Sequence, residues 1–197
     1  TIAFAWNKHE GIAMSIDYDG SKDTSPNLVK REYLRNFFDT FPNKLVFHNA
    51  GYDVTVLIYT LYMEHLEDTE GLLKGLEVFS RITEDTQIIT YLAMNSTARN
   101  SLSLKDLAQS FAGDYGIDEI NDITKIPLDK LLAYNLTDAF STWFVLEKYY
   151  PMVVEDNQLE VYTDLFRPAL FDIIQMQLTG MPVLPERIHE VKLQLTT

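Results

Sequence analysis

Residues 45–57, which read LVFHNAGYDVTVL, join a short apolar run to a helical pattern and carry polar groups where the two meet. The run LVFH favours a buried strand, and VTVLIYTLYMEHL after it is most simply a helix. In sheets flanked by helices, ligands bind at the loops beyond the strand ends. His48, Asn49 and Asp53 are therefore candidate site residues. For Asp53, a structural role as an N-cap or Asx turn remains an alternative.

The N-terminal part of the chain predicts a hairpin followed by a helix. Apolar residues alternate over 2–6 and again over 12–16, with the turn-like NKHEG between these runs, so two antiparallel strands are expected. Ser25 and Pro26 suit the N-cap and the first position of a helix that reaches residue 41.

The rest of the chain reads mainly as helices. EVFSRI, residues 77–82, is expected as a short strand, and Asp85 is well placed to cap the helix that follows it. Another helix ends near Gly113, and a long one from residue 127 is closed by Pro151. Two more helices, separated by a Gly-Met-Pro break, complete the chain. This order predicts an α/β domain, with a mixed sheet flanked by helices and a C-terminal helical extension.

Composition limits the class of protein. Of the 197 residues, 46% are hydrophobic and 23% are charged, which is typical of a globular chain. No apolar run approaches the roughly 20 residues that cross a bilayer, and the start TIAFAWNKHEG lacks the pattern of a secretion signal. Because there is no cysteine, disulfides and thiolate metal sites are excluded, which says little about the compartment. Cytoplasm is the default expectation, with no membrane partner.

The net charge of −13 argues against a protein that coats duplex nucleic acid. It does not argue against a nuclease, since metal-dependent nucleases need clustered carboxylates whose bound cations reverse the local charge. Other chemistries find less support. None of the four histidines has the spacing of a zinc site. A Ser-His-Asp triad is compatible with the composition, but there is no G-x-S-x-G elbow and no glycine-rich phosphate loop.

Tyr134 and Asp138 form a second candidate pair. They are spaced i, i+4 in a strongly helical segment, which places both on one side of the helix. A chain with 11 tyrosines is expected to contain about one such pair by chance, so the spacing alone has no weight. Asp138 is flanked by Leu136 and Phe140, however, and an unpaired buried carboxylate there would cost several kcal/mol. Asp138 is therefore expected to have a hydrogen-bond partner or a bound metal, unless its side of the helix is exposed to solvent.

Three blocks in order, FHNAGYDVTVL, EDTQIITYLAMNSTARNSLSLKDLA and AYNLTDAFSTWFVLEKYY, resemble the 3′-to-5′ exonucleases of the DEDD superfamily whose third motif is Y-x3-D. Asn49-x3-Asp53 matches the second motif of that family, and Tyr134-x3-Asp138 matches the third. Asp85 matches the start of the family's Asp-Thr helix and is expected to be structural. The resemblance implies an RNase H-like (DnaQ-like) exonuclease fold.

The resemblance divides the chain into two parts. Residues 1–150 are expected to form the exonuclease domain, and residues 151–197 are similar to the helical connector toward the polymerase domain in family A DNA polymerases of bacterial or phage type. Leu184 or Pro185 stands where that family usually has an Asp. The resemblance thus implies a proofreading domain whose partner is the polymerase domain of the same parent chain.

The family mechanism implies a role for each matching residue. Asp53 and Asp138 would be ligands of Mg²⁺ or Mn²⁺ in a site of two ions about 4 Å apart. Tyr134 would orient the attacking water, because a phenol is a weak base at neutral pH. Asn49 and His48 would contact the terminal nucleotide or its phosphate. The implied substrate is the 3′ end of single-stranded DNA, whose bases can stack on apolar side chains without sequence readout.

One motif of the family has no match in the sequence. The first motif, Asp-x-Glu, lies on the strand before the one that IAFAW resembles, so the first strand of the fold is expected to be missing. Asp17 and Asp19 are no substitute, because they follow the second strand. If the chain is complete, we therefore expect weak metal binding and little hydrolysis. A catalytically inactive scaffold within a polymerase and a stand-alone RNA-trimming exonuclease of the same superfamily are the alternatives.

Overall fold

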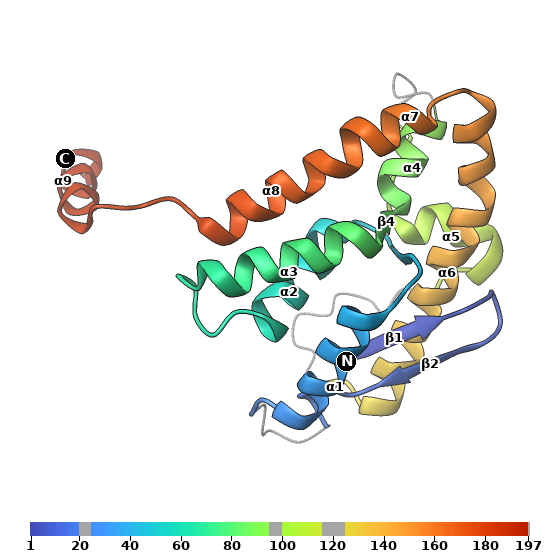
Figure 1. Ribbon diagram of the computed structural model, residues 1–197, viewed down its shortest axis with the longest axis horizontal. Coiled ribbons are helices and arrows are strands. Elements are labelled where there is room, and N and C mark those ends of the chain that lie inside the picture. The colour runs from blue at the N-terminus through green and yellow to red at the C-terminus, as the bar shows by residue number, and fades with distance from the viewer. Residues whose placement is uncertain (20–24, 95–99, 116–124, 197) are drawn as a thin grey trace.

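Helices make up most of the described chain, and the strands of this part form two small sheets (Figure 1). The computed structural model describes residues 1–19, 25–94, 100–115 and 125–196. Within the second of the three resembling sequence blocks, residues 95–99 lie outside the described residues. The described chain is a mixed α/β fold, as the sequence predicts.

The first sheet is the N-terminal hairpin of β1 (Ile2–Ala5) and β2 (Gly11–Met14). Its strands are antiparallel, and Ile2 pairs with Met14. The side-chain oxygen of Asn7 closes the turn by accepting hydrogen bonds from the backbone N–H groups of two residues that follow it. The predicted hairpin is confirmed.

Gly11 brings this hairpin close to the long helix α6 (Leu128–Glu155). A Cβ atom at this position would lie 2.6 Å from the Phe4 carbonyl oxygen and 2.8 Å from Leu136 Cδ1. Both separations are shorter than van der Waals contact, so only glycine fits without a shift of the hairpin or the helix.

The second sheet pairs β3 (Leu45–Phe47) with β4 (Thr83–Asp85) in parallel. The crossover between them contains α2 (Ala50–Leu61) and α3 (Thr69–Ile82). Among the described residues no strand hydrogen-bonds to both sheets, so the expected single mixed sheet does not form. The two pairs are instead held side by side through α6, which contacts β1, β2 and β3. An RNase H-like fold stays a prediction.

The first helix, α1 (Leu28–Thr40), begins later than the sequence suggested. The side-chain oxygen of Asn27 accepts a hydrogen bond from the backbone N–H of Lys30, which satisfies a donor of the first turn. Asn27 is therefore the N-cap, and the prediction that Ser25 caps the helix with Pro26 at its first position is wrong.

The strand predicted at residues 77–82 is also wrong, because α3 continues through this segment. Val78, Phe79 and Ile82 are buried at helical spacing, so the apolar run that suggested a strand is the inner side of a helix. The adjacent strand, β4, starts only at Thr83.

Two further helices agree with the sequence. α4 (Thr86–Ala93) begins directly after β4, and Asp85 is its N-cap. α5 (Leu104–Ala112) ends at Gly113, whose φ of 67° lies in the left-handed region that favours glycine. The helix predicted to stop near this glycine is thus confirmed.

The prediction that Pro151 closes the long helix is wrong, because α6 continues to Glu155. Proline lacks the N–H that would bond to the preceding turn, which normally disfavours a helix interior. Val153, however, is fully buried in the second core, and this burial favours the helical path for the last turn.

The C-terminal segment consists of α7 (Leu159–Val161), a π-helical turn η3 (Tyr162–Phe166), α8 (Arg167–Thr179) and α9 (Pro185–Thr196). Gly180, with φ of 70°, ends α8. In Figure 1, α9 lies at the end of an extended segment, apart from the other helices.

Two apolar clusters form the core. The first lies between α1, α2, α3 and α8, and its most buried members are Phe38, Ala50, Val54, Ile58, Phe79, Ile82 and Ile174. The second lies between α4, α5, α6 and η3, and its most buried members are Ile89, Ala108, Val145, Val153 and Tyr162. Because α8 shares the first cluster, part of the segment predicted as a connector packs on the body of the protein. The division at residue 150 stays a prediction.

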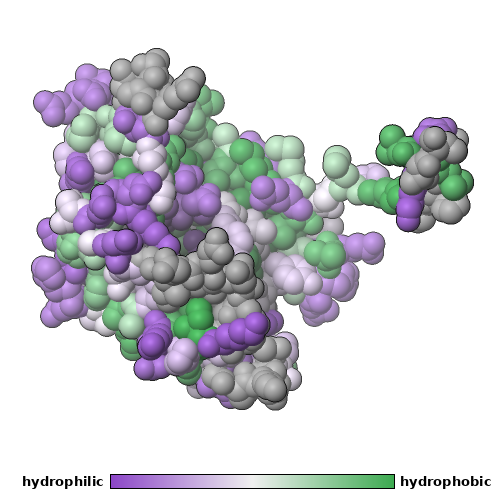
Figure 2. All heavy atoms as spheres, turned by 180° about the vertical axis from the view of Figure 1, so that it is seen from behind, coloured by the Kyte–Doolittle hydropathy of each residue, from purple (hydrophilic) through white to green (hydrophobic). Residues whose placement is uncertain are grey.

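Hydrophobic side chains are also exposed near the C-terminus, where Figure 2 shows them on α9 and on the segment that leads to it. Met181 and Leu195 are among the most exposed apolar residues of the described chain. Among the described helices, none combines the length and apolar character that crossing a bilayer requires.

Candidate functional site

Asp85 joins the N-termini of two helices at the end of the parallel strand pair. Its carboxylate is almost fully buried and accepts four backbone hydrogen bonds. The N–H groups of Gln87 (2.7 Å) and Ile88 (3.4 Å) belong to the start of α4, and those of Asn49 (3.2 Å) and Ala50 (2.9 Å) to the start of α2. A carboxylate is favoured at helix N-termini, so Asp85 holds both first turns in place. This geometry supports the structural role expected for Asp85.

Asn49 occupies the turn from β3 into α2 in the left-handed conformation, with φ of 62°. Asn tolerates this region better than most residues with a side chain. Its backbone N–H is used by Asp85, whereas its side chain makes no capping bond and is exposed. The Asn49 amide is thus open to an incoming molecule, and its substrate contact stays a prediction.

Asp53 lies in the first turn of α2, near the same junction. The helix begins at Ala50, so the alternative that Asp53 is its N-cap is wrong. Although Asp53 as a residue is exposed, the protein around its carboxyl group hinders hydration. Burial raises the pKa of Asp53 to about 6, and the negative charges of Asp85 and Asp138 add to the increase. Asp53 and Asp138, which are distant in sequence, therefore lie within electrostatic reach of each other.

Asp138 projects from α6 and has the partner that its apolar surroundings require. The phenol O–H of Tyr115 donates a hydrogen bond of 2.8 Å to Asp138 Oδ1. Burial raises the pKa of the Asp138 carboxyl, while the Tyr115 hydrogen bond and the positive charge of Lys105 oppose that increase. Asp138 is thus a half-buried, hydrogen-bonded carboxylate.

Tyr134 lies one helical turn before Asp138 on α6, as the sequence predicts. Its ring is in contact with the ring of Tyr115, with centroids 5.8 Å apart. Lys105 Nζ lies over the same ring, 5.5 Å from its centroid, which is a cation–π distance. Tyr134 and Asp138 therefore share two neighbours, one from the segment after α5 and one from α5 itself.

His48 is used within the protein. Its Nε2 lies 2.9 Å from the Leu102 carbonyl oxygen, and its Nδ1 lies 2.9 Å from Thr86 Oγ1. Burial lowers the pKa of His48, against the effects of the Leu102 bond and the charge of Asp85. The neutral ring then donates from Nε2 to the Leu102 carbonyl, and its Nδ1 faces the Thr86 hydroxyl, which also lies 3.1 Å from the Phe47 carbonyl oxygen as a donor. This geometry ties the end of β3 to α4 and to the segment before α5, and a substrate contact by His48 stays a prediction.

The chemistry of Asp53 and Asp138 fits a hard divalent cation. Both are carboxylates, which supply the oxygen ligands that Mg²⁺ and Mn²⁺ prefer, and both have raised pKa values that a nearby cation would lower. Within the described ranges, however, no group of three or more His, Cys, Asp or Glu side chains is arranged to hold a metal ion. The described residues thus contain a pair of candidate ligands.

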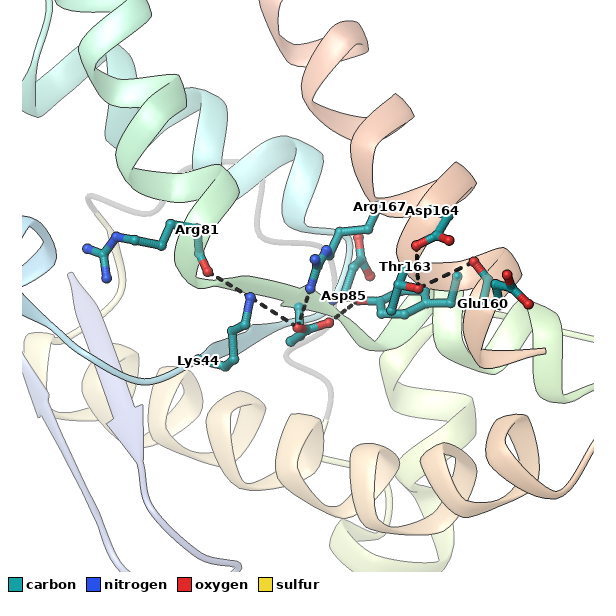
Figure 3. A network of polar contacts seen from close by, with 9 residues as sticks. Lys44, Arg81, Asp85, Glu160, Thr163, Asp164 and Arg167 are labelled. Atoms are coloured by element: carbon teal, nitrogen blue, oxygen red, sulfur yellow. Dashed lines mark hydrogen bonds and ion pairs between the residues drawn. The ribbon is translucent and has the colours of Figure 1, made fainter. Parts of the chain in front are cut away.

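A separate polar network holds the opposite side of the strand pair (Figure 3). Glu84 Oε1 accepts from Arg167 Nη1 at 2.8 Å and lies 3.5 Å from Lys44 Nζ. Its other oxygen accepts from the hydroxyl of Tyr162 at 2.6 Å, and that hydroxyl in turn accepts from the backbone N–H of Asp85 at 2.9 Å. Burial and the Glu84 hydrogen bond raise the pKa of Tyr162. The network fixes β4, and with it Asp85, to η3 and α8.

Sequence reasoning missed two residues of the site, Tyr115 and Lys105. Neither lies at a helical or motif spacing from Tyr134 or Asp138. Each contacts them because α5 and the segment after it pack on α6 in the folded protein. No pattern in the sequence could have identified them.

Comparison with known proteins gives one distant similarity. No family model matches the chain, and no solved structure matches it. The chain is 26% identical over 183 residues to the DNA polymerase of Escherichia phage T5. The match covers 83% of this chain and 20% of that polymerase, so the chain spans about a fifth of its length. This similarity supports a protein related to DNA polymerases.

Proposed function

We propose that the chain is the 3′-to-5′ exonuclease domain of a DNA polymerase and removes nucleotides from the 3′ end of single-stranded DNA. The proposal rests on the two motif matches, Asn49-x3-Asp53 on α2 and Tyr134-x3-Asp138 on α6, together with the position of Asp138 near enough for its charge to add to the effects of burial and Asp85 on the pKa of Asp53. Asp53 and Asp138 are the two acidic residues that match separate exonuclease motifs, and the fold brings them into one neighbourhood. The distant similarity to a phage DNA polymerase gives independent support for the polymerase context.

Asp53 and Asp138 would hold Mg²⁺ or Mn²⁺ in this proposal. Bound there, divalent ions would supply a water of lowered pKa and would stabilise the leaving 3′ oxygen. The chain's own contribution is to keep two carboxylates close together, although their mutual repulsion and partial burial oppose this arrangement. The rigid junction at Asp85 and the long helix α6 fix the positions from which the two carboxylates project.

Tyr134 has the role of orienting the attacking water. Its ring contacts the ring of Tyr115 and lies beneath the Lys105 ammonium group, and both contacts limit the movement of the phenol. On the other side of the site, the exposed amide of Asn49 would contact the terminal nucleotide or its phosphate. His48, with both ring nitrogens bonded inside the protein, would act by holding the Asn49 turn in place.

Substrate selection follows from the charge of the chain and from access to the site. A net charge of −13 disfavours wide contact with a nucleic-acid backbone, so binding is concentrated where Lys105 and bound cations offset the carboxylates. A frayed single-stranded 3′ end can enter such a limited site, whereas a paired end cannot without unpairing.

The test is the shortening of a 5′-labelled single-stranded DNA by the intact protein with Mg²⁺ or Mn²⁺. We expect Asp53→Asn and Asp138→Asn each to reduce kcat by at least about 100-fold, since each removes a charged ligand. Asp172→Asn is the matched control, because it makes the same change at an exposed position on α8. Full activity of either site variant would contradict the proposal.

An inactive scaffold domain is the second candidate, favoured because no three His, Cys, Asp or Glu side chains among the described residues are grouped so that they could hold a metal ion. The same assay separates the two. Binding of single-stranded DNA without metal-dependent shortening would favour the scaffold. Faster shortening of an RNA of the same sequence would instead favour an RNA-trimming enzyme.

A further inference from the structure

Tyr115 connects the segment after α5 to the candidate site on α6. It follows Gly113, the residue that ends α5, and its side chain is half-buried. The O–H group donates to Asp138 Oδ1 over 2.8 Å, a distance typical of a good hydrogen bond to a carboxylate. This tyrosine is not part of any motif in the sequence.

The ring of Tyr115 also contacts the other motif residue on α6. Its centroid is 5.8 Å from that of Tyr134, and the two planes are inclined at 47°. Tyr134 is in turn covered by the Lys105 ammonium group, 5.5 Å from its ring centroid. Ring packing therefore limits where the Tyr115 hydroxyl can be, so its hydrogen bond to Asp138 has a defined direction.

Asp138 needs such a fixed partner. Without a partner, a half-buried aspartate near a second carboxylate would turn toward solvent. Turning it back when a divalent cation binds would reduce the binding free energy. A carboxylate has about four acceptor positions on its two oxygens, so one bond from Tyr115 leaves capacity for a metal ion. The hydrogen bond can thus orient Asp138 without blocking it.

We propose that Tyr115 is a positioning residue that holds the Asp138 carboxylate in the orientation in which it binds a divalent cation. The proposal rests on the proposed function, in which Asp138 is a metal ligand. Hydrogen-bond partners of metal ligands typically change metal affinity by about 10- to 100-fold when they are removed. Tyr115 therefore acts on the affinity for the cation through Asp138, without touching the cation or the DNA.

The test is the Tyr115→Phe variant of the intact protein, which keeps the ring and loses only the hydroxyl. Mn²⁺ affinity is measured by isothermal titration calorimetry, and thermal unfolding verifies that the variant is folded. We expect Mn²⁺ to bind about 10-fold more weakly to Tyr115→Phe than to the unchanged protein. Tyr33→Phe, which removes an exposed phenol hydroxyl on α1, is the matched control and should bind Mn²⁺ as before.

A double-mutant cycle separates positioning from a general structural effect. If Tyr115 acts through Asp138, adding Tyr115→Phe to Asp138→Asn should cause no further loss of Mn²⁺ affinity. Unchanged affinity in Tyr115→Phe, or an equal loss in both backgrounds, would overturn the positioning role and leave the proposed function standing. Absence of Mn²⁺ binding by the unchanged protein would overturn the proposed function, and this assignment with it.

Discussion

Replacing Asp53 with asparagine is expected to make the protein more stable at neutral pH. Asn has nearly the same shape as Asp and cannot ionise, so the substitution removes the charge with little change in packing. The charge is unfavourable in the folded state, because burial and the neighbouring Asp85 and Asp138 raise the pKa of Asp53 from 3.8 to about 6. Carboxylates with raised pKa values are concentrated at functional sites, which agrees with the cation-binding role proposed for Asp53.

The magnitude follows from the shift in pKa. An increase of about two pH units corresponds to about 3 kcal/mol, since each unit is worth about 1.4 kcal/mol. Asp53 is an exposed residue whose charge water screens, so we expect about 1 kcal/mol. In a domain of this size that difference raises the unfolding temperature by about 2–4 °C.

The pH dependence fixes the sign. The folded-state pKa of Asp53 lies above its unfolded value, so the stability that protonation of Asp53 contributes is fully present below pH 3.8 and is lost as the pH rises through about 6. Urea unfolding of the unchanged protein and of Asp53→Asn at pH 4.5 and pH 7.5, in the presence of a chelator, measures the effect. The variant should gain stability mainly at the higher pH. An equal gain at both pH values, or a loss at pH 7.5, would refute this reasoning.

Two further substitutions test the scaffold of the site. Asp85→Ala removes a buried acceptor shared by the N-termini of α2 and α4, and we expect urea unfolding to report a loss of about 3 kcal/mol; a loss below about 1 kcal/mol would contradict the shared cap. Gly11→Ala introduces a Cβ atom 2.6 Å from the Phe4 carbonyl oxygen, and thermal unfolding should show a cost of about 1–3 kcal/mol, whereas an unchanged unfolding temperature would show that the hairpin can shift freely.

The sequence correctly predicted those elements that are determined by interactions between residues close together in the chain. The alternation around NKHEG predicted the hairpin, and Asp85 before the apolar helix predicted its N-cap, because both depend on neighbouring backbone groups. The i, i+4 relation of Tyr134 and Asp138 followed from helix geometry alone.

The errors arose where tertiary contacts override local preference. Residues 77–82 suit both a strand and the buried side of a helix, and packing in the first core selects the helix. Similarly, α6 passes Pro151 because Val153 is buried beyond it. The start of α2 at Ala50 depends on Asp85, which reaches it from another strand.

The candidate site could be predicted only in part for the same reason. Asp53 and Asp138 were identified as residues, but their proximity depends on how α2 and α6 meet. Tyr115, which is bonded to Asp138, carries no signal in the sequence because the contact is formed by the fold alone.

The central claim is that Asp53 and Asp138 belong to one cation site. The most direct measurement is an NMR titration of the Asp53 carboxyl carbon in the unchanged protein and in Asp138→Asn, first without divalent cations and then with Mg²⁺. We predict a pKa of about 6 for Asp53 without cations, a lower value once the Asp138 charge is removed, and a lower value again when Mg²⁺ is added to the unchanged protein. A pKa near the ordinary value of 3.8 that neither Asp138→Asn nor Mg²⁺ changes would contradict the claim.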